Sequence, residues 1–572
     1  MVAQDVLLAS PVMISSANGV RRILFVLSGV AFAGAAFAWW LGGTFAGWPD
    51  PRSSFSAFYV IFARDEVWGL ILVAAFSLGA ALFLFCSDHA PPPGSGTNGF
   101  ARREALLLVV IVSGVFAVAA LGTHFVCHDY ALSADEFMAD FQAQIFLRGK
   151  VTAEVPSQWV DAVRIIRPTF VDYFPATHSW KATYLPVYAA MRAVFQGIYL
   201  QSFLNPCLAA LTVLALYGTT RNIWPDEKQN ALLAVLLLAG SVQFLVMAMT
   251  AYSMPAHLAL NTVWLWLYSR PDRRGFYFAP VVGVLAIGLH QPIVHALFVA
   301  PFLLRLVVQK KWRTVGIYGL IYLSGSAIWY AWRTHYLPPA AGSPASFFRL
   351  FNLKMIVIQP MDFLLVLGWS CLATPLLAVV GFRRIFREQP IVQDAALSCL
   401  LTFGFYYFFY LDQGHGWGYR YFHGTLACLI IVAVAGWRAL AERIEPRRLR
   451  NFMAAGVAAS LFIQLPLRCY QAETFTRPFA RASEMIHSIP VQVVGLNPLD
   501  AWYSADLVRN GPFLQELPVV AALVRLRKNE LDVLRRARSA RIITRHELGA
   551  LGLSTVPDAH YRHDPFQLGM GK

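Results

Sequence analysis

Apolar blocks of roughly 20 residues recur along this chain, separated by short polar stretches. A helix of about that length crosses the hydrocarbon core of a bilayer. Charged residues make up 14% of the 572 residues, whereas a soluble domain usually carries about 25%. The sequence therefore predicts an all-α polytopic membrane protein. A β-barrel is excluded, because its strands would be short segments of alternating hydrophobicity.

Thirteen blocks are long or apolar enough to be interpreted as transmembrane spans. Because several of them are short, the expected number holds to within about two. The expected spans are 23–41, 67–85, 104–125, 200–219, 230–249, 255–268, 276–290, 294–308, 314–332, 361–382, 394–411, 426–440 and 452–467.

The net charge of +15 comes from basic clusters in the short loops between apolar blocks, such as Arg21-Arg22, Arg102-Arg103, Arg383-Arg384 and the segment 443–450. Such clustering follows the positive-inside rule and sets topology, so it argues against nucleic-acid binding. It predicts a cytoplasmic N-terminus, and thirteen spans then put the C-terminus outside.

Composition divides the chain into three parts. Residues 1–101 form an extra N-terminal transmembrane hairpin, closed by a Pro/Gly-rich cytoplasmic linker. Residues 102–467 form the transmembrane core, with a long extracytoplasmic loop at 127–183. Residues 468–572 are more polar, with three short strand-like segments and a helix-like one, and predict a small extracytoplasmic C-terminal α/β domain. The strands are expected within 491–498, 518–524 and 540–544, and the helix within 529–538.

The long loop opens with the acidic stretch SADEFMADFQAQIFLRGK, from Ser133 to Lys150. It places the adjacent carboxylates Asp135 and Glu136 next to a membrane, where such groups are costly unless they have a function. Apolar residues at helical spacing predict an amphipathic helix on the membrane surface. A second surface helix is expected over 184–196.

The polar residues that are unusual for a membrane protein nearly all map to the extracytoplasmic face. Their convergence predicts a substrate cavity open to that side. A carboxylate there can serve as a general base, and an Arg or Lys can hold a lipid phosphate. The candidates are Asp135 and Glu136 for catalysis, Arg420 and Lys181 for the donor phosphate, and Tyr252, His257, His290, Gln291, His415, Tyr419 and His423 for the cavity.

Structural roles compete with these functional ones. Ser133 and Glu136 also fit a capping box at a helix start, which leaves Asp135 as the stronger catalytic candidate. The glycine-rich turn DQGHGWGYRYFH also fits an interfacial aromatic belt. His290 and His295 also suit hydrogen bonding at helix ends, although a metal site with His257 stays open.

The acidic stretch and the expected topology resemble the GT-C superfamily of membrane glycosyltransferases, which use polyprenyl-phosphate-linked sugars. The resemblance spans about 102–467, rests mainly on Asp135-Glu136 and more weakly on the turn at 415–423, and is strongest to the protein O-mannosyltransferase and lipid A aminoarabinose transferase branch. In that superfamily the acidic loop follows the first span, whereas here it follows the third. An added N-terminal hairpin accounts for the difference.

The resemblance implies an inverting sugar transfer from a polyprenyl-phosphate donor to an acceptor hydroxyl, with Asp135 as general base. It also implies a cell-envelope enzyme of a bacterial inner membrane. Its partners would be the lipid-linked donor, membrane lipids, and a lipid, glycan or protein acceptor. Some members of the superfamily bind a divalent metal at the acidic pair, so a metal stays open. The alternative is a transporter or flippase of a lipid-linked substrate, for which internal repeats would be expected.

Overall fold

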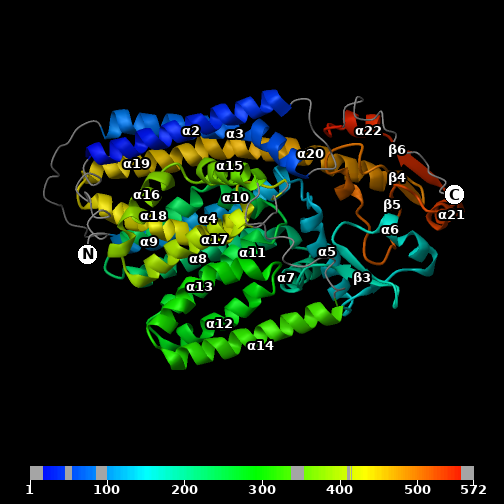
Figure 1. Ribbon diagram of the computed structural model, residues 1–572, viewed down its shortest axis with the longest axis horizontal. Coiled ribbons are helices and arrows are strands. Elements are labelled where there is room, and N and C mark those ends of the chain that lie inside the picture. The colour runs from blue at the N-terminus through cyan, green and yellow to red at the C-terminus, as the bar shows by residue number, and fades with distance from the viewer. Residues whose placement is uncertain are drawn as a thin grey trace.

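The computed structural model describes residues 17–45, 54–85, 100–336, 353–408, 413 and 415–555. Long helices form a bundle, and two small sheets sit together at one end of it (Figure 1). Most of the expected Pro/Gly linker, and Asp412 of the glycine-rich turn, lie outside the described residues.

The bundle contains helices of very different length. In the part of the chain that the structure describes, seven helices are long and apolar enough to cross a membrane, or up to nine when each of two bent pairs counts as one span. The chain is thus a polytopic membrane protein, and the number thirteen stays a prediction. The helices of the bundle are α2 (Ala17–Phe45), α3 (Ser54–Gly79), α4 (Phe100–Phe125), α8 (Leu204–Ile223), α9 (Gln229–Ala239), α10 (Val242–Met249), α11 (Met254–Ser269), α12 (Arg273–Ile287), α13 (Pro292–Val308), α14 (Trp312–Tyr336), α15 (Leu353–Trp369), α16 (Thr374–Arg384), α17 (Pro390–Phe408), α18 (Leu426–Ala441), α19 (Pro446–Ala459) and α20 (Leu465–Ser488).

Two segments expected as single spans are broken helices. Helices α9 and α10 meet at 59°, and the α15–α16 segment bends by 116°. At the second break the backbone N–H of Leu372 donates to the Ser460 hydroxyl at 2.9 Å. Buried backbone groups at membrane depth need such partners, so a side chain from α19–α20 makes this break possible. Hydropathy alone does not reveal it.

The N-terminal hairpin packs as α2 against α3 and is fixed to the core by a buried ion pair. Arg468 of α20 is fully buried, and its Nη2 lies 2.6 Å from Oε2 of Glu66 on α3. The indole N–H of Trp369 donates to the same carboxylate at 2.9 Å, and the Arg468 guanidinium stacks over that ring at 4.3 Å. The carboxylate therefore has both a cation and a neutral donor.

The sheets come from the loop 127–183 and from the C-terminal part of the chain. The loop supplies β1 (Ala153–Glu154), β2 (Val171–Phe174) and β3 (Ser179–Ala182) in an antiparallel sheet of order β1-β3-β2. The tail supplies β4 (Val493–Leu496), β5 (Val519–Ala522) and β6 (Ala540–Ile543) in a parallel sheet of order β5-β4-β6. The accompanying helices are α5 (Ala134–Leu147) and α6 (Val163–Ile166) in the loop, α7 (Val187–Gly197) just after it, and α21 (Lys528–Arg536) and α22 (Arg545–Ala550) in the tail.

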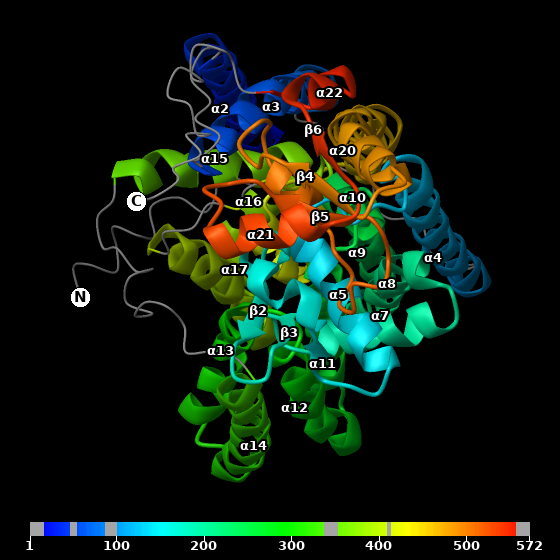
Figure 2. The same ribbon diagram turned by 90° about the vertical axis from the view of Figure 1, so that its right-hand side faces the viewer.

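The three tail strands fall within the windows expected from the sequence, and α21 begins one residue before its expected window. The tail is not a separate layer, however, because it shares an apolar core with the loop. Phe141, Ile145 and Trp180 of the loop pack in one cluster with Val493 and Val519 of the tail. We call this body, residues 127–183 with 489–555, the loop–tail unit; Figure 2 views the molecule from that end.

The shared core corrects one expectation. Helix α5 forms as expected, but Phe141 and Ile145 are fully buried against protein and do not lie on a membrane surface. An amphipathic pattern shows that one face of a helix is covered, but it does not show whether protein or membrane covers that face. The expected domain boundary at 467/468 also falls inside a continuous helix, α20, which runs on to Ser488.

We expect Arg468→Met to destabilise the protein by about 3–5 kcal/mol, because it leaves the Glu66 carboxylate buried without its cation. The double variant Arg468→Met/Glu66→Met removes both charges and should recover most of that loss. Denaturant titration in detergent micelles measures both. A single variant as stable as the parent would show that the pair does not hold the hairpin.

Candidate active site

Helix α5 begins with a complete capping box. Glu136 donates its backbone N–H to the Ser133 hydroxyl at 3.2 Å, and its Oε2 accepts from the Ser133 backbone N–H at 2.8 Å. Its other oxygen, Oε1, accepts from the Ala251 backbone N–H at 2.9 Å. Burial raises the pKa of Glu136 against these hydrogen bonds. Glu136 thus ties the start of α5 to the link between α10 and α11, which is a positioning role.

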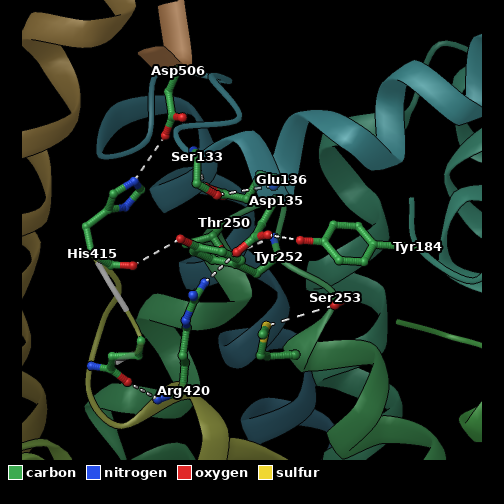
Figure 3. Close-up of polar contacts among 12 residues, drawn as sticks. Ser133, Asp135, Glu136, Tyr184, Thr250, Tyr252, Ser253, His415, Arg420 and Asp506 are labelled. Atoms are coloured by element: carbon green, nitrogen blue, oxygen red, sulfur yellow. Dashed lines mark hydrogen bonds and ion pairs between the residues drawn. The ribbon is translucent and has the colours of Figure 1, made fainter. Parts of the chain in front are cut away.

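Asp135 has different partners from its neighbour. One of its oxygens accepts from the Tyr184 hydroxyl, and the other lies 3.0 Å from Nη1 of Arg420 (Figure 3). Burial alone raises the pKa of this carboxyl, but the Arg420 charge, with His290 and the Tyr184 hydrogen bond, outweighs it and holds the pKa below its usual value. Asp135 is therefore an ionised carboxylate held between a cation and a phenol.

Arg420 is presented by a loop that is folded back on itself. Its backbone N–H donates to Oε1 of Gln413 at 2.9 Å, while Nε2 of Gln413 donates to the Gly418 carbonyl at 2.8 Å. Gly418 has a φ of +67°, and a Cβ there would lie 2.8 Å from the side chain of Gln243 on α10. Glycine is thus needed at 418 for both the turn and the close packing.

The guanidinium of Arg420 has hydrogen-bonding capacity that its contacts with the described residues do not use. It lies 5.1 Å from the ring centroid of Tyr252, and its Nε is buried with no hydrogen-bond partner among the described residues. A guanidinium presents five N–H donors in a fixed fork that suits a phosphate. One buried donor of this side chain is therefore not used by the contacts that hold it.

Tyr184 completes the site, although no motif in the sequence identifies it as a site residue. It lies in the link between β3 and α7, and its ring packs against His290 with centroids 3.8 Å apart and planes 40° apart. Burial lowers the pKa of His290 to about 4, and burial together with Asp135 raises that of Tyr184 well above its usual value, so both are neutral near pH 7. A cavity of about 20 Å³ between these side chains has room for about one water molecule.

The other cavity candidates divide into two groups. Tyr252 and His415 border the site, since the Tyr252 hydroxyl donates to the His415 carbonyl at 3.2 Å and the His415 ring faces Asp506 of the tail at 3.4 Å. His257 and His423 are buried, and both of their rings have no hydrogen-bond partner among the described residues. The first pair joins the turn to the loop–tail unit.

Three predicted residues are positioned by other contacts. The Lys181 ammonium is buried over the ring of Trp332, 4.7 Å from its centroid, and burial lowers its pKa to about 8 against the charge of Asp172. Gln291 caps α13 without a side-chain hydrogen bond to that helix. Tyr419 is buried against Phe403, with ring centroids 5.7 Å apart.

The carboxylates of the acidic pair are engaged by protein donors. Each of its four oxygens already accepts from a backbone N–H, a hydroxyl or a guanidinium, as described above. Within the described ranges, no group of three or more His, Cys, Asp or Glu side chains is arranged to hold a metal. His295 instead bonds Asn261 and Tyr322 through its two nitrogens, at 2.8 and 2.9 Å.

Comparisons with known proteins give a likeness of structure only. No protein family model matches the chain, and no curated protein matches it. Similar solved structures include ArnT from Cupriavidus metallidurans bound to undecaprenyl phosphate, at 13% identity and a TM-score of 0.47, covering 72% of this chain and 86% of ArnT. The apo state of the same protein matches at 13% identity and a TM-score of 0.47, covering 75% of this chain and 87% of ArnT. The functional reading therefore rests on the site itself.

We expect Tyr184→Phe to raise the pKa of Asp135, because the lost hydrogen bond favours the ionised carboxyl. Infrared titration of the carboxyl band measures the pKa, with Asp135→Asn used to assign the band. Tyr173→Phe is the matched control, since that hydroxyl bonds His178 at 2.8 Å and not Asp135. An unchanged titration in Tyr184→Phe would rule out a role for this phenol.

Proposed function

We propose that the protein is a GT-C-type glycosyltransferase that moves a sugar from a polyprenyl-phosphate donor to an acceptor hydroxyl. The observation that supports this most is the contact between Asp135 and Arg420, on a scaffold with many membrane-crossing helices. The residues that carry the sequence resemblance, Asp135-Glu136 and the turn at 415–423, supply both partners of that contact. The carboxylate suits a general base, and the guanidinium suits a phosphate.

The chemistry needs both groups in one place. As the acceptor oxygen bonds to the anomeric carbon, its proton passes to the Asp135 carboxylate. The bond from that carbon to the phosphate oxygen breaks on the opposite side, so the configuration inverts. The electron pair leaves with polyprenyl phosphate, whose new charge Arg420 stabilises. Glu136 has no part in these steps, and holds α5 at the α10–α11 link.

Asp135 and Arg420 are paired at 3.0 Å. A carboxylate that is paired with an arginine is a weak base, because the cation lowers its pKa. A donor phosphate competes for the same guanidinium. When Arg420 turns to the phosphate, burial raises the pKa of Asp135 and makes it a stronger base. Donor binding and activation of the base are thereby one event.

Helix α5, whose first turn carries Asp135, lies at the end of the bundle that carries the loop–tail unit (Figure 1). We place this end outside the cytoplasm, on the charge distribution of the loops. The resemblance to the GT-C superfamily favours an enzyme of a bacterial inner membrane. Polar groups gathered at one end fit an enzyme better than a transporter, which places its site near the bilayer midplane. The acceptor hydroxyl would enter beside the Tyr252 and His415 border.

We expect Asp135→Asn to lower sugar transfer by about 10²–10⁴-fold, the usual contribution of a general base. The assay incubates purified protein with labelled polyprenyl-phosphate sugars and measures release of free lipid phosphate. Asp161→Asn, an exposed carboxylate of the same loop, is the control and should match the parent. Sugar transfer by Asp135→Asn at the parental rate would refute the proposal.

We also expect Arg420→Gln to move the acid limb of the kcat/KM profile to higher pH. The base must be ionised, its pKa is held down by Arg420, and burial raises that pKa once the cation is gone. Arg420→Lys keeps a charge and should shift the limb less. A limb at the parental pH in Arg420→Gln, with activity merely lower throughout, would mean that Asp135 is not the base.

A further inference from the structure

A polar cavity lies on the face of α5 that points away from Asp135. Its volume of about 330 Å³ is within the range of roughly 300–1,000 Å³ that small-molecule sites occupy. On α5 it is lined by Phe137, Asp140 and Gln144, whereas Asp135 lines a different and smaller cavity. At 3.6 residues per turn, these three positions lie on the side of the helix opposite Asp135.

The cavity lies where the loop–tail unit meets the helices of the core. Gln196 of α7 and Ser202, in the turn between α7 and α8, line it from the core. Arg509 of the tail lines it from the other side. Neither Asp135 nor Arg420 belongs to the lining. A ligand in this cavity would therefore contact both the core and the loop–tail unit without touching the groups assigned to sugar transfer.

The two arginines at the cavity are held by protein contacts. Arg192 donates to Oδ1 of Asp140 through Nε at 2.8 Å and through Nη2 at 2.5 Å. Arg509 donates to the Leu132 carbonyl at 2.7 Å, and its guanidinium lies 4.0 Å from the centroid of the Tyr130 ring. An anionic ligand would have to compete with these contacts. The cavity therefore favours a neutral ligand over a phosphate or a carboxylate.

Several uncharged groups at the cavity are not used by the protein. In the part of the chain that the structure describes, no side-chain hydrogen bond to protein is made by Gln144, Gln196, Gln201 or Ser202. An amide group both donates and accepts hydrogen bonds, and so does a hydroxyl group. Most of the other lining side chains are also polar, so an apolar side chain of a peptide would find little surface to cover. The lining thus matches a neutral ligand that is rich in hydroxyl groups.

We propose that this cavity binds a neutral saccharide at a site separate from the proposed active site. A sugar ring carries several hydroxyls, each of which can pair with an amide or a serine. Gln144 lies on the side of the loop–tail unit, and Gln196 and Ser202 lie on the side of the core, so the sugar would bridge the two. The inference needs neither a lipid donor nor a transfer reaction, and it does not rest on the proposed function.

Binding of the methyl glycosides of glucose, galactose, mannose and N-acetylglucosamine tests the proposal. Saturation-transfer difference NMR measures it on the purified protein in a detergent without a sugar head group. We expect saturable binding of at least one glycoside, and Gln144→Leu/Gln201→Leu should weaken it by about tenfold or more, because two hydrogen bonds are lost. The matched control is Gln158→Leu/Gln309→Leu, which changes two exposed glutamines outside the cavity and should bind as the parent does.

A second variant, Ser202→Phe, keeps both glutamines and narrows the cavity from the core side. It should weaken binding of the same glycoside by a similar factor. Saturable binding of none of the four glycosides, or parental affinity in both cavity variants, would overturn the proposal. Glucose 6-phosphate and triglycine represent the anionic and the peptide alternatives, and tighter binding of either one than of every neutral glycoside would also overturn it.

A photoreactive diazirine derivative of the bound glycoside separates this cavity from the site at Asp135. Cross-links within 196–202 would support the cavity, whereas cross-links confined to Tyr184 and 420–423 would refute it. Asp135→Asn should bind the glycoside as the parent does. A parent that binds the glycoside in the cavity but transfers no sugar would refute the proposed function alone.

Discussion

The contact between Asp135 and Arg420 joins two parts of the chain that are 285 residues apart, and most of the surrounding structure serves to hold it. On one side, the Ser133–Glu136 capping box fixes the first turn of α5. On the other, Gln413 and Gly418 fold the turn that presents Arg420. Because a charged pair that is removed from water is favourable only in good geometry, both supports must be rigid.

The loop–tail unit supplies that rigidity for α5. Packing α5 between its own sheet and the tail buries Phe141 and Trp180 with Val493 and Val519 in one core. Polar contacts cross the same boundary, since the Trp180 indole donates to the Pro512 carbonyl at 2.7 Å and Asn510 donates to the Ile166 carbonyl at 2.6 Å. The tail is thus part of the scaffold of the site.

Local patterns in the sequence predicted local structure well. The SADE stretch gave the capping box, and β-branched runs gave the tail strands, because each depends on neighbours in the chain. Tyr184 and the orientation of Lys181 were not predictable, since each is set by a distant partner, His290 in one case and Trp332 in the other. The break before α16 was not predictable for the same reason. Its backbone N–H at Leu372 donates to Ser460, which lies 88 residues away in the chain.

The Glu66–Arg468 pair also constrains the order in which the protein can assemble. The two partners are separated by 402 residues, so α3 enters the membrane long before α20 exists. Until then its carboxylate has no cation from α20, and a lone charge is costly in a bilayer. The ion pair that fixes α2 and α3 to the core therefore forms only after α20 has been synthesised. A chain that ends before α20 lacks Arg468. In such a chain this ion pair cannot fix the first two helices to the core.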